Sequence, residues 1–283
     1  MKRQDLAIVG IWYDGYYDIW EDFLELKEKF WKDCPYPMYI VNQTKELAYK
    51  KKYDVTVIHA GNDAEYSRKI QTAIEQIDAD YLLLVLEDFF FSRPVESKLL
   101  ENVLNIVKEN DLDYFSMPLS EFLPNKVGMP FKGYEGVYDF SPAFEYTLSA
   151  QPAIWNKKFL KRCVGSENYN AWVFEGVYIK SPKAHTEKFL SKCKVDKSNF
   201  LGFKHGALQG KMIPEIVRYY EGIGYKLKTK RPELPLSTVI KRKIRFSIPK
   251  SFITFLKKFI KNKSVASRYA NEIDHQIQIL NLD

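Results

Sequence analysis

Cysteine is scarce in this chain of 283 residues: there are three, Cys34, Cys163 and Cys193, and they lie far apart. Because no Cys-x-x-Cys pair and no cysteine–histidine cluster occurs, the sequence indicates neither a zinc site nor a disulfide framework. We therefore expect a reducing, cytoplasmic setting. The GxGxxG, Walker A and GxSxG motifs are also absent, which argues against the nucleotide-binding and hydrolase classes that depend on them.

Long apolar runs are missing as well, and none approaches the roughly 20 residues that a transmembrane helix requires. The N-terminal run 6–12 is followed by Tyr13 and Asp14, so it is too short for a signal peptide and predicts a first β-strand. Apolar residues still make up 46% of the chain and aromatic residues 15%, which predicts a packed core. The length suits one large α/β domain, or one domain with a helical extension.

Short apolar runs alternate with helical patterns through the first 118 residues. Strands are predicted at 6–12, 38–42, 55–59, 81–86 and 114–117, and helices at 19–31, 66–77 and 95–109. This order is typical of an α/β layered domain, and the unbroken apolar run 81–86 predicts a central parallel strand. Residues 119–146 are rich in proline, glycine and aromatic residues instead, which indicates a long loop that lines a pocket.

Basic residues are concentrated near the end of the chain. Residues 240–263 contain nine lysines and arginines and no acidic residue, within a protein of net charge +7. The spacing of Phe252, Phe255, Leu256, Phe259 and Ile260 predicts one apolar stripe on a basic helix. Because apolar residues are interleaved at helical spacing, the segment favours an anionic membrane surface over nucleic acid as its partner.

Two acidic residues, Glu87 and Asp88, follow directly after the run 81–86. Ligands of open α/β sheets bind at the carboxyl ends of the strands, so this pair predicts contact with a divalent cation or with a ribose. With its upstream turn and helix, the segment 56–91 resembles the nucleotide-sugar half of GT-A glycosyltransferases, where such a strand ends in a DxD-type motif. The resemblance extends in layout over residues 1–180.

The acidic pair departs from the family motif at one position. Glu87 takes the place of the first acid and Asp88 the variable middle position, but Phe89 stands where the second acid would be. The resemblance therefore implies either an Mg²⁺ or Mn²⁺ ion bound through Glu87 and Asp88 or a metal-independent enzyme with a nucleotide-sugar as co-substrate. A solvated turn after the strand is the simpler alternative.

A second segment, 149–175, is similar to the acceptor side of bacterial polysaccharide glycosyltransferases, where a Ser-x-Gln-Pro-x-x-Trp run precedes Trp-x-x-Glu. The resemblance implies that Glu175 is the general base that deprotonates the acceptor hydroxyl in an inverting reaction. It also implies acceptor contacts for four further residues, Ser149, Gln151, Trp155 and Trp172. The alternative is that both tryptophans belong to the core and that Glu175 caps a helix.

The remaining candidates are polar residues near strand ends or late in the chain. Asp14, Asn42 and Asp63 follow the first three predicted strands, where a base or ribose of the donor would bind, although Asp63 also suits a helix N-cap. In GT-A enzymes a late basic residue reaches the metal or the diphosphate, which the resemblance implies for His205 and Lys211 and equally for Arg231. An ordinary surface histidine is the alternative for His205.

The sequence is therefore interpreted as a GT-A-like α/β domain over 1–235, with a mixed, mainly parallel sheet flanked by helices. We expect a donor half at 1–118, an acceptor half at 119–235, and a basic amphipathic helical extension at 236–283. The expected activity is sugar transfer from a nucleotide-sugar to a lipid-linked or polysaccharide acceptor in bacterial surface-glycan or capsule synthesis, at the cytoplasmic face of the membrane. The alternatives are a catalytically degenerate glycan- or membrane-binding module and a membrane- or nucleic-acid-associated scaffold.

Overall fold

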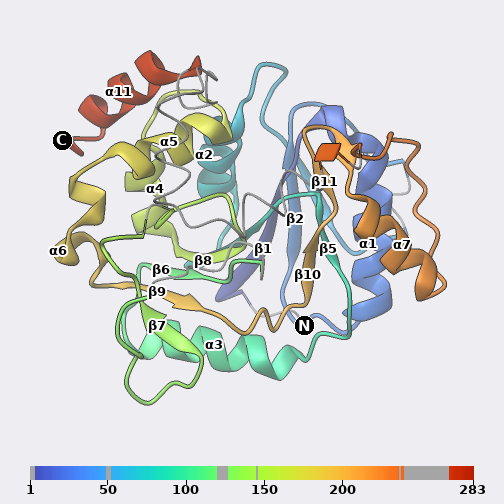
Figure 1. The fold of residues 1–283 in the computed structure, drawn as a ribbon, viewed down its shortest axis with the longest axis horizontal. Helices are drawn as coiled ribbons and strands as arrows, with labels where there is room; N and C mark the ends of the chain where they lie inside the picture. The colour runs from blue at the N-terminus through green and yellow to red at the C-terminus, as the bar shows by residue number, and fades with distance from the viewer. Residues whose placement is uncertain (1–3, 49–51, 120–126, 145, 236, 239–267) are drawn as a thin grey trace.

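A computed structural model describes residues 4–48, 52–119, 127–144, 146–235, 237–238 and 268–283 (Figure 1). Its centre is one eight-stranded sheet whose strands, in spatial order, are β3 (Thr56–His59), β2 (Met38–Asn42), β1 (Leu6–Ile11), β4 (Tyr81–Val85), β8 (Ala153–Asn156), β6 (Tyr114–Ser116), β9 (Cys193–Asp196) and β7 (Val137–Asp139). The first four strands are parallel, and so are β6 and β9. Strand β8 is antiparallel to both of its neighbours, and β7 is antiparallel to β9. The predicted mixed, mainly parallel sheet is therefore confirmed.

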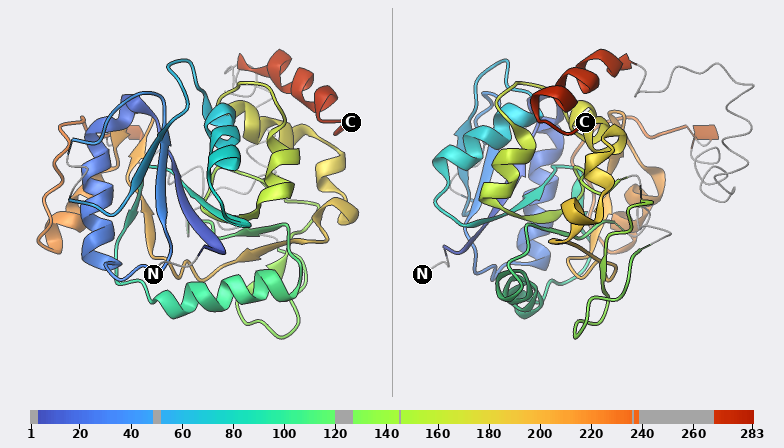
Figure 2. Two further views of the ribbon diagram at one scale, coloured as in Figure 1. Left: turned by 180° about the vertical axis from the view of Figure 1, so that it is seen from behind. Right: turned by 90° about the vertical axis from the view of Figure 1, so that its left-hand side faces the viewer.

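Side chains alternate between two hydrophobic cores, one on each face of the sheet, as the period of two in a strand requires. In β4, Leu83 and Val85 enter one core, while Leu82 and Leu84 enter the other. The first face is covered by α1 (Tyr17–Phe30), α3 (Ser97–Glu109) and α7 (Pro214–Gly222). The second is covered by α2 (Tyr66–Gln76), α4 (Lys157–Val164), α5 (Ala171–Lys180), α6 (Glu187–Leu190) and α11 (Ala270–Ile279), as the rotated views show (Figure 2). Because helices cover both faces of the sheet, the nearly all-apolar strand β4 is buried, as its sequence predicts.

Two short strand pairs lie outside the main sheet. Strand β5 (Phe89–Phe91) pairs antiparallel with β10 (Phe203–His205), and β11 (Ala207–Leu208) pairs with β12 (Lys211–Met212). Two single-turn 3₁₀ helices, η1 (Asp14–Tyr16) and η3 (Lys183–His185), complete the described elements. The pairing of β5 with β10 brings the late segment of the chain against the residues that follow β4.

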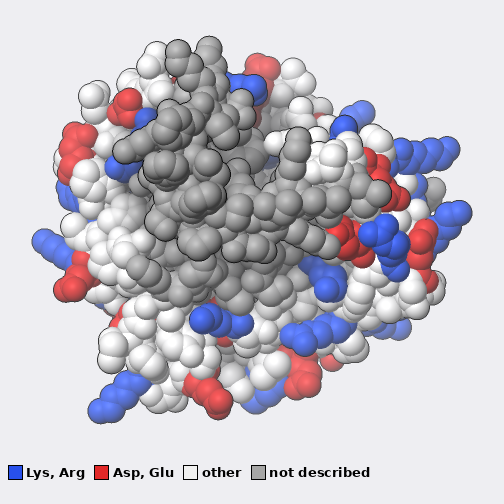
Figure 3. Space-filling view, viewed as in Figure 1, with Lys and Arg blue, Asp and Glu red and all other residues white. Residues whose placement is uncertain are grey.

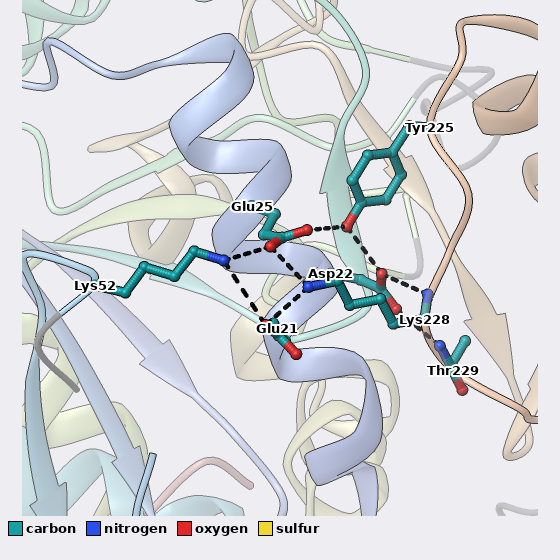
Figure 4. A network of polar contacts seen from close by, with 7 residues as sticks. All are labelled: Glu21, Asp22, Glu25, Lys52, Tyr225, Lys228 and Thr229. Carbon is teal, nitrogen blue, oxygen red and sulfur yellow. Dashed lines mark hydrogen bonds and ion pairs between the residues drawn. The ribbon is translucent and has the colours of Figure 1, made fainter. Parts of the chain in front are cut away.

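A polar network fastens the segment after α7 onto α1 (Figure 4). The buried Asp22 accepts hydrogen bonds from Tyr225 Oη at 2.9 Å and from the backbone nitrogens of Lys228 and Thr229 at 2.9 and 3.2 Å. Lys228 Nζ reaches Glu25 Oε1 at 2.7 Å. Buried polar groups are retained at low cost only when they are paired in this way. The network thereby fixes the path of the chain toward residue 231.

The last helix belongs to the packed domain. Ile273 and Ile277 of α11 are buried in the second core, and a Cβ at Gly176 of α5 would lie 2.3 Å from Ile273 Cδ1. Ser181 Oγ and Lys183 Nζ also donate to carbonyls near the chain end. The predicted extension 236–283 therefore ends in a helix that is packed onto α5, while its basic stretch 240–263 lies outside the described residues. No helix among the described residues is long and apolar enough to cross a membrane.

Candidate functional site

The carboxyl ends of β1, β2 and β4 meet at one edge of the sheet, because these strands are parallel neighbours. Strand β8 runs in the opposite direction and its register pairs Ala153 with Leu84, so the residues just before β8 lie at the same edge. We call this edge, with the loops that leave it, the site edge. Ligands of open α/β sheets bind at edges of this kind. Five of the predicted site residues lie in its loops, namely Asp14, Glu87, Asp88, Ser149 and Gln151.

Glu87 is buried at the site edge and faces the loop after β1. Its side chain is only 6% exposed, and Oε1 accepts a hydrogen bond from the Tyr13 backbone nitrogen at 3.2 Å. Burial, reinforced by the neighbouring negative charge of Asp88, raises the pKa of Glu87 to about 8. The structure thus gives Glu87 a partner inside the protein, whereas the sequence predicts a contact with donor or metal.

Asp88 is paired with His205 across the β5–β10 strand pair. His205 Nε2 lies 3.1 Å from Asp88 Oδ2, and the two side chains are 14% and 11% exposed for Asp88 and His205 respectively. The backbone nitrogen of Gly206 also donates to the Asp88 carbonyl at 2.7 Å. The second carboxylate oxygen, Oδ1, is buried without a hydrogen-bond partner among the described residues. Asp88 therefore keeps one acceptor atom for a ligand, and His205 fixes the orientation of the carboxylate.

Asp14 joins the loop after β1 to the loop after β2. Its carboxylate accepts hydrogen bonds from Asn42 Nδ2 at 2.8 Å, from the Gln43 backbone at 3.2 Å, from the Thr44 backbone and hydroxyl at 2.9 and 3.2 Å, and from the Lys45 backbone at 3.0 Å. Partial burial alone would raise the pKa of Asp14, but these hydrogen bonds outweigh it and the pKa is lowered. Asp14 is thus committed to holding two loops together.

Two other predicted donor contacts, Asn42 and Asp63, differ in their exposure. Asn42 is fully buried and its Oδ1 lies 3.0 Å from His59 Nδ1, so the prediction of a donor contact is wrong for this side chain. Asp63 is exposed in the turn before α2, but the residue that caps this helix is Glu65 and no side-chain cap is formed. The alternative of Asp63 as helix N-cap is therefore wrong, and its donor contact stays a prediction.

The late basic residues differ in how they are used. Lys211 is exposed on β12, where it pairs with Leu208 of β11, and its role stays a prediction. Arg231 binds Asp18, with Nε–Oδ2 at 2.9 Å, and its guanidinium lies 4.1 Å from the centre of the Tyr16 ring. It also donates to the Gly15 carbonyl. These contacts place Arg231 as a brace between the late segment and the loop after β1, so it is not available to a diphosphate.

Glu175 lies in α5, which begins after Asn170; the Asn170 side chain caps the helix by accepting from the backbone nitrogens of Trp172 and Val173. The Glu175 side chain is partly buried, and Oε1 accepts a hydrogen bond from the Ala150 backbone at 3.0 Å. Burial raises the pKa of Glu175, and this single hydrogen bond only partly opposes the effect. Since Ala150 precedes β8, the contact ties Glu175 to the site edge.

The predicted acceptor contacts separate into buried and accessible residues. Trp155 is 1% exposed and packs in the second core, 4.3 Å from the Tyr114 ring, so the prediction that it stacks on a sugar is wrong. Trp172 is 49% exposed and lies three residues before Glu175, on the same face of α5. Ser149 is buried, and Gln151 Oε1 accepts from the Leu119 backbone at 3.4 Å. Trp172 is thus the accessible aromatic surface beside the predicted base.

Sequence reasoning missed Lys69, although the sequence contains a signal for it. Lys69 is 4% exposed, and its Nζ donates to the Trp12 carbonyl at 2.8 Å, at the point where β1 enters its loop. In α2 it lies on the same helical face as Tyr66, Ile70 and Ala73, all of which are buried. A lysine at a position where the 3.6-residue period expects an apolar residue is the available signal.

Comparison with known proteins adds little to this geometry. No protein-family model matches the sequence, and no curated protein sequence matches it significantly. Among solved structures, residues 1–349 of S. aureus TarS match with a TM-score of 0.43 and 15% identity, covering 70% of this chain and 58% of that one. The same TarS fragment in complex with UDP gives a TM-score of 0.45 and 16% identity, with the same coverage. A cytidylyltransferase from Leptospira borgpetersenii gives 0.37 and 11%, covering 57% of this chain and 64% of that one. The function therefore has to be argued from the site itself.

Proposed function

We propose that this protein is a nucleotide-sugar-dependent glycosyltransferase that inverts the configuration of the transferred sugar. The observation that carries the proposal is the position of β8, which begins beside the end of β4. It brings the loop that binds Glu175 to the edge where β4 delivers Asp88. One candidate for donor binding and one candidate for proton transfer thereby share the site edge, as a two-substrate transfer requires.

In the proposed reaction Glu175 accepts the proton of the acceptor hydroxyl. The acceptor oxygen forms a bond to the anomeric carbon while the bond from that carbon to the diphosphate oxygen breaks, and the nucleoside diphosphate leaves. A raised pKa suits Glu175 to this role, because a general base works best when its pKa lies nearer the working pH. Trp172 offers an apolar face to the acceptor sugar, and hydrogen bonds from Ser149 and Gln151 to its hydroxyls stay predictions.

The site can also be tested for a divalent ion. Among the described residues no group of three or more histidine, cysteine, aspartate or glutamate side chains could hold a metal. A bound Mg²⁺ or Mn²⁺ would be held by Asp88 Oδ1, which has no hydrogen-bond partner in the described part of the chain, together with diphosphate oxygens and water. Such an ion would supply positive charge to the leaving diphosphate. Glu87 is not part of this set, because its carboxylate is buried against Tyr13.

A thermal-shift screen of nucleotide-sugars and nucleoside diphosphates, with and without Mn²⁺, tests the proposal. A ligand that binds only the folded state raises the melting temperature, by an amount that reflects the free energy RT ln(1 + [L]/Kd). We expect one nucleotide class to stabilise the protein and its sugar to be hydrolysed or transferred. Absence of both stabilisation and turnover with all common donors would contradict the proposal.

The acceptor is proposed to be lipid-linked or a polysaccharide, reached at the inner face of a bacterial membrane. Outside 240–263 the chain contains 34 basic and 36 acidic residues, and charges of both signs are interspersed over the described part of the face in Figure 3. The excess positive charge thus resides in 240–263, which favours that segment for contact with anionic lipid. A surface-bound enzyme would meet a lipid-borne acceptor at raised local concentration.

Because 268–283 is packed in the domain, the membrane test should leave the end of the chain in place. We expect the full chain with its nine basic residues at 240–263 changed to glutamine to lose co-sedimentation with vesicles rich in phosphatidylglycerol. A control with exposed Lys158, Lys161 and Arg162 changed to glutamine should still bind. Binding that survives the nine changes would contradict a role for 240–263.

A catalytically degenerate binding module remains the second candidate, and Phe89 favours it. Phe89 is 2% exposed, and the centre of its ring lies 6.5 Å from that of Phe203. A core residue therefore occupies the position that the second acid has in the DxD-type motif. Nucleotide stabilisation without hydrolysis or transfer in the screen above would support this candidate over the enzyme.

A further inference from the structure

The peptide group between Trp12 and Tyr13 is held from both sides by ionisable side chains of distant segments. Lys69 Nζ of α2 donates to the Trp12 carbonyl at 2.8 Å, and Glu87 Oε1 accepts from the Tyr13 backbone nitrogen at 3.2 Å. The carbonyl and the N–H belong to the same peptide unit. The Trp12 nitrogen, in turn, donates to Val41 at 2.9 Å. This is the peptide at which β1 gives way to the loop of the site edge.

Both ionisable side chains sit where packing alone would favour apolar residues. Lys69 and Glu87 are 4% and 6% exposed, and burial costs free energy for a charge unless it is paired. Burial accordingly lowers the pKa of Lys69, while the charge of Glu87 opposes that change. A methionine at position 69 would fill the apolar face of α2 without this cost. Each of the two side chains instead makes a hydrogen bond to the Trp12–Tyr13 peptide, which an apolar residue could not make.

The held peptide is the first part of the loop after β1, so its position affects where the following residues of the loop lie at the site edge. Tyr13 is 53% exposed there, and the Lys69 ammonium lies 5.7 Å from the centre of its ring. Tyr16 Oη accepts a hydrogen bond from the Gly210 nitrogen at 2.7 Å, which secures the far end of the loop. The same loop is also held by the hydrogen bonds of Asp14 and by the contact of Arg231 with the Gly15 carbonyl, and the Lys69 and Glu87 contacts are the ones next to β4.

We propose that Lys69 and Glu87 are positioning residues that clamp the Trp12–Tyr13 peptide and so set the loop after β1 to bind the nucleoside diphosphate part of the donor. This inference rests on the proposed function. It also assigns Glu87 a structural hydrogen bond in place of the metal contact implied by the family motif. The clamp requires an acceptor atom at position 87, not a negative charge, and a donor atom at position 69.

Isothermal titration with UDP, GDP and CDP tests the clamp, using the full chain and the nucleotide that the wild-type protein binds best. Glu87→Gln should keep the dissociation constant within about twofold, because the amide oxygen still accepts from Tyr13. Glu87→Leu and Lys69→Met should each raise it about tenfold, or about 1.4 kcal/mol.

A spectroscopic measurement separates the clamp from a general loss of stability. In protein labelled with ¹⁵N-tyrosine, the Tyr13 amide signal is identified by its disappearance in Tyr13→Phe. Loss of its hydrogen bond in Glu87→Leu should move that proton signal upfield, while Glu87→Gln should leave it near the wild-type position. An unmoved Tyr13 signal in Glu87→Leu would overturn the clamp.

The binding data distinguish two failures. If the wild-type protein binds none of the three nucleotides, the proposed function fails, and with it the assignment of a ligand to the clamp. If the wild-type protein binds but Lys69→Met and Glu87→Leu bind equally well, the positioning role alone is overturned. A Glu87→Gln variant as weak as Glu87→Leu would also overturn it, because the charge itself would then contact the ligand.

Discussion

Two carboxylates near the site edge, Asp14 in the loop after β1 and Glu175 in α5, differ in how many hydrogen bonds they accept and in the direction of their pKa shifts. Asp14 accepts five hydrogen bonds, which lower its pKa. Glu175 accepts one among the described residues, from Ala150, and burial raises its pKa. A carboxylate whose lone pairs are used by the backbone is a structural element, whereas one that keeps acceptor capacity and a raised proton affinity suits proton transfer.

The largest effect is expected for Glu175→Gln. Turnover should fall by roughly 10³-fold, within the range typical of general-base removal. The glutamine oxygen still accepts from Ala150, so the melting temperature and nucleotide affinity should change little. The measurement is the initial rate of sugar transfer with the donor found in the screen, and Glu167→Gln, an exposed glutamate just before α5, serves as the control. A wild-type rate in Glu175→Gln would remove the basis of the comparison.

Asp14→Asn should act on stability. The amide group brings its own N–H donors toward backbone nitrogens and removes the negative charge, so we expect a loss of about 3 kcal/mol in the free energy of unfolding. Urea denaturation measures it, with exposed Asp63→Asn as a matched control that should be neutral. Because the pKa of Asp14 is lowered, its contribution is present above the unfolded pKa and is lost as the pH falls through the folded value. An unchanged free energy would show that the five hydrogen bonds do not define this region.

Glu87 extends the comparison to a third carboxylate, which should show the opposite pH dependence. Its pKa is about 8 in the folded protein, so the folded state holds a proton that the unfolded state releases above pH 4.5. The resulting stability is fully present below pH 4.5 and is lost as the pH rises toward 8. From pH 5 to 8 the wild-type protein should lose roughly 3–4 kcal/mol relative to Glu87→Gln in urea denaturation. Parallel pH curves for the two proteins would contradict the raised pKa.

The smallest effect is expected for Trp172→Ala, which tests whether the surroundings of Glu175 bind the acceptor sugar. Removing an exposed ring should raise the acceptor KM by up to about tenfold, since stacking on a sugar contributes on the order of 1 kcal/mol. The free energy of unfolding should change by less than about 0.5 kcal/mol. Buried Trp155→Ala provides the contrast, with a loss of roughly 3–5 kcal/mol in stability. An unaltered KM would exclude Trp172 from the acceptor site.

Much of the fold could be predicted because it depends on local patterns. The runs 38–42 and 81–86 were predicted as strands, and β2 and β4 occupy Met38–Asn42 and Tyr81–Val85. Their apolar residues alternate between the two cores, which is a property of sequence spacing. The candidate site was less predictable. Asn42 and Trp155 have residue types that suit sugar and base contacts, but both are buried, and burial depends on neighbours far away in the chain.

The sequence by itself determined the order of strands and helices, the delivery of Glu87 and Asp88 to the end of an apolar strand, and the concentration of positive charge at 240–263. Only the tertiary structure decided what those carboxylates contact. Asp88 meets His205 because β5 pairs with β10, and Glu87 meets the Tyr13 peptide because β4 lies beside β1. Glu175 reaches the same edge because β8 enters the sheet antiparallel to β4. Hydrophobic periodicity is a local property that can be recognised in the sequence. The hydrogen bond between Tyr13 and Glu87 joins residues 74 positions apart, so it exists only after the strands have paired.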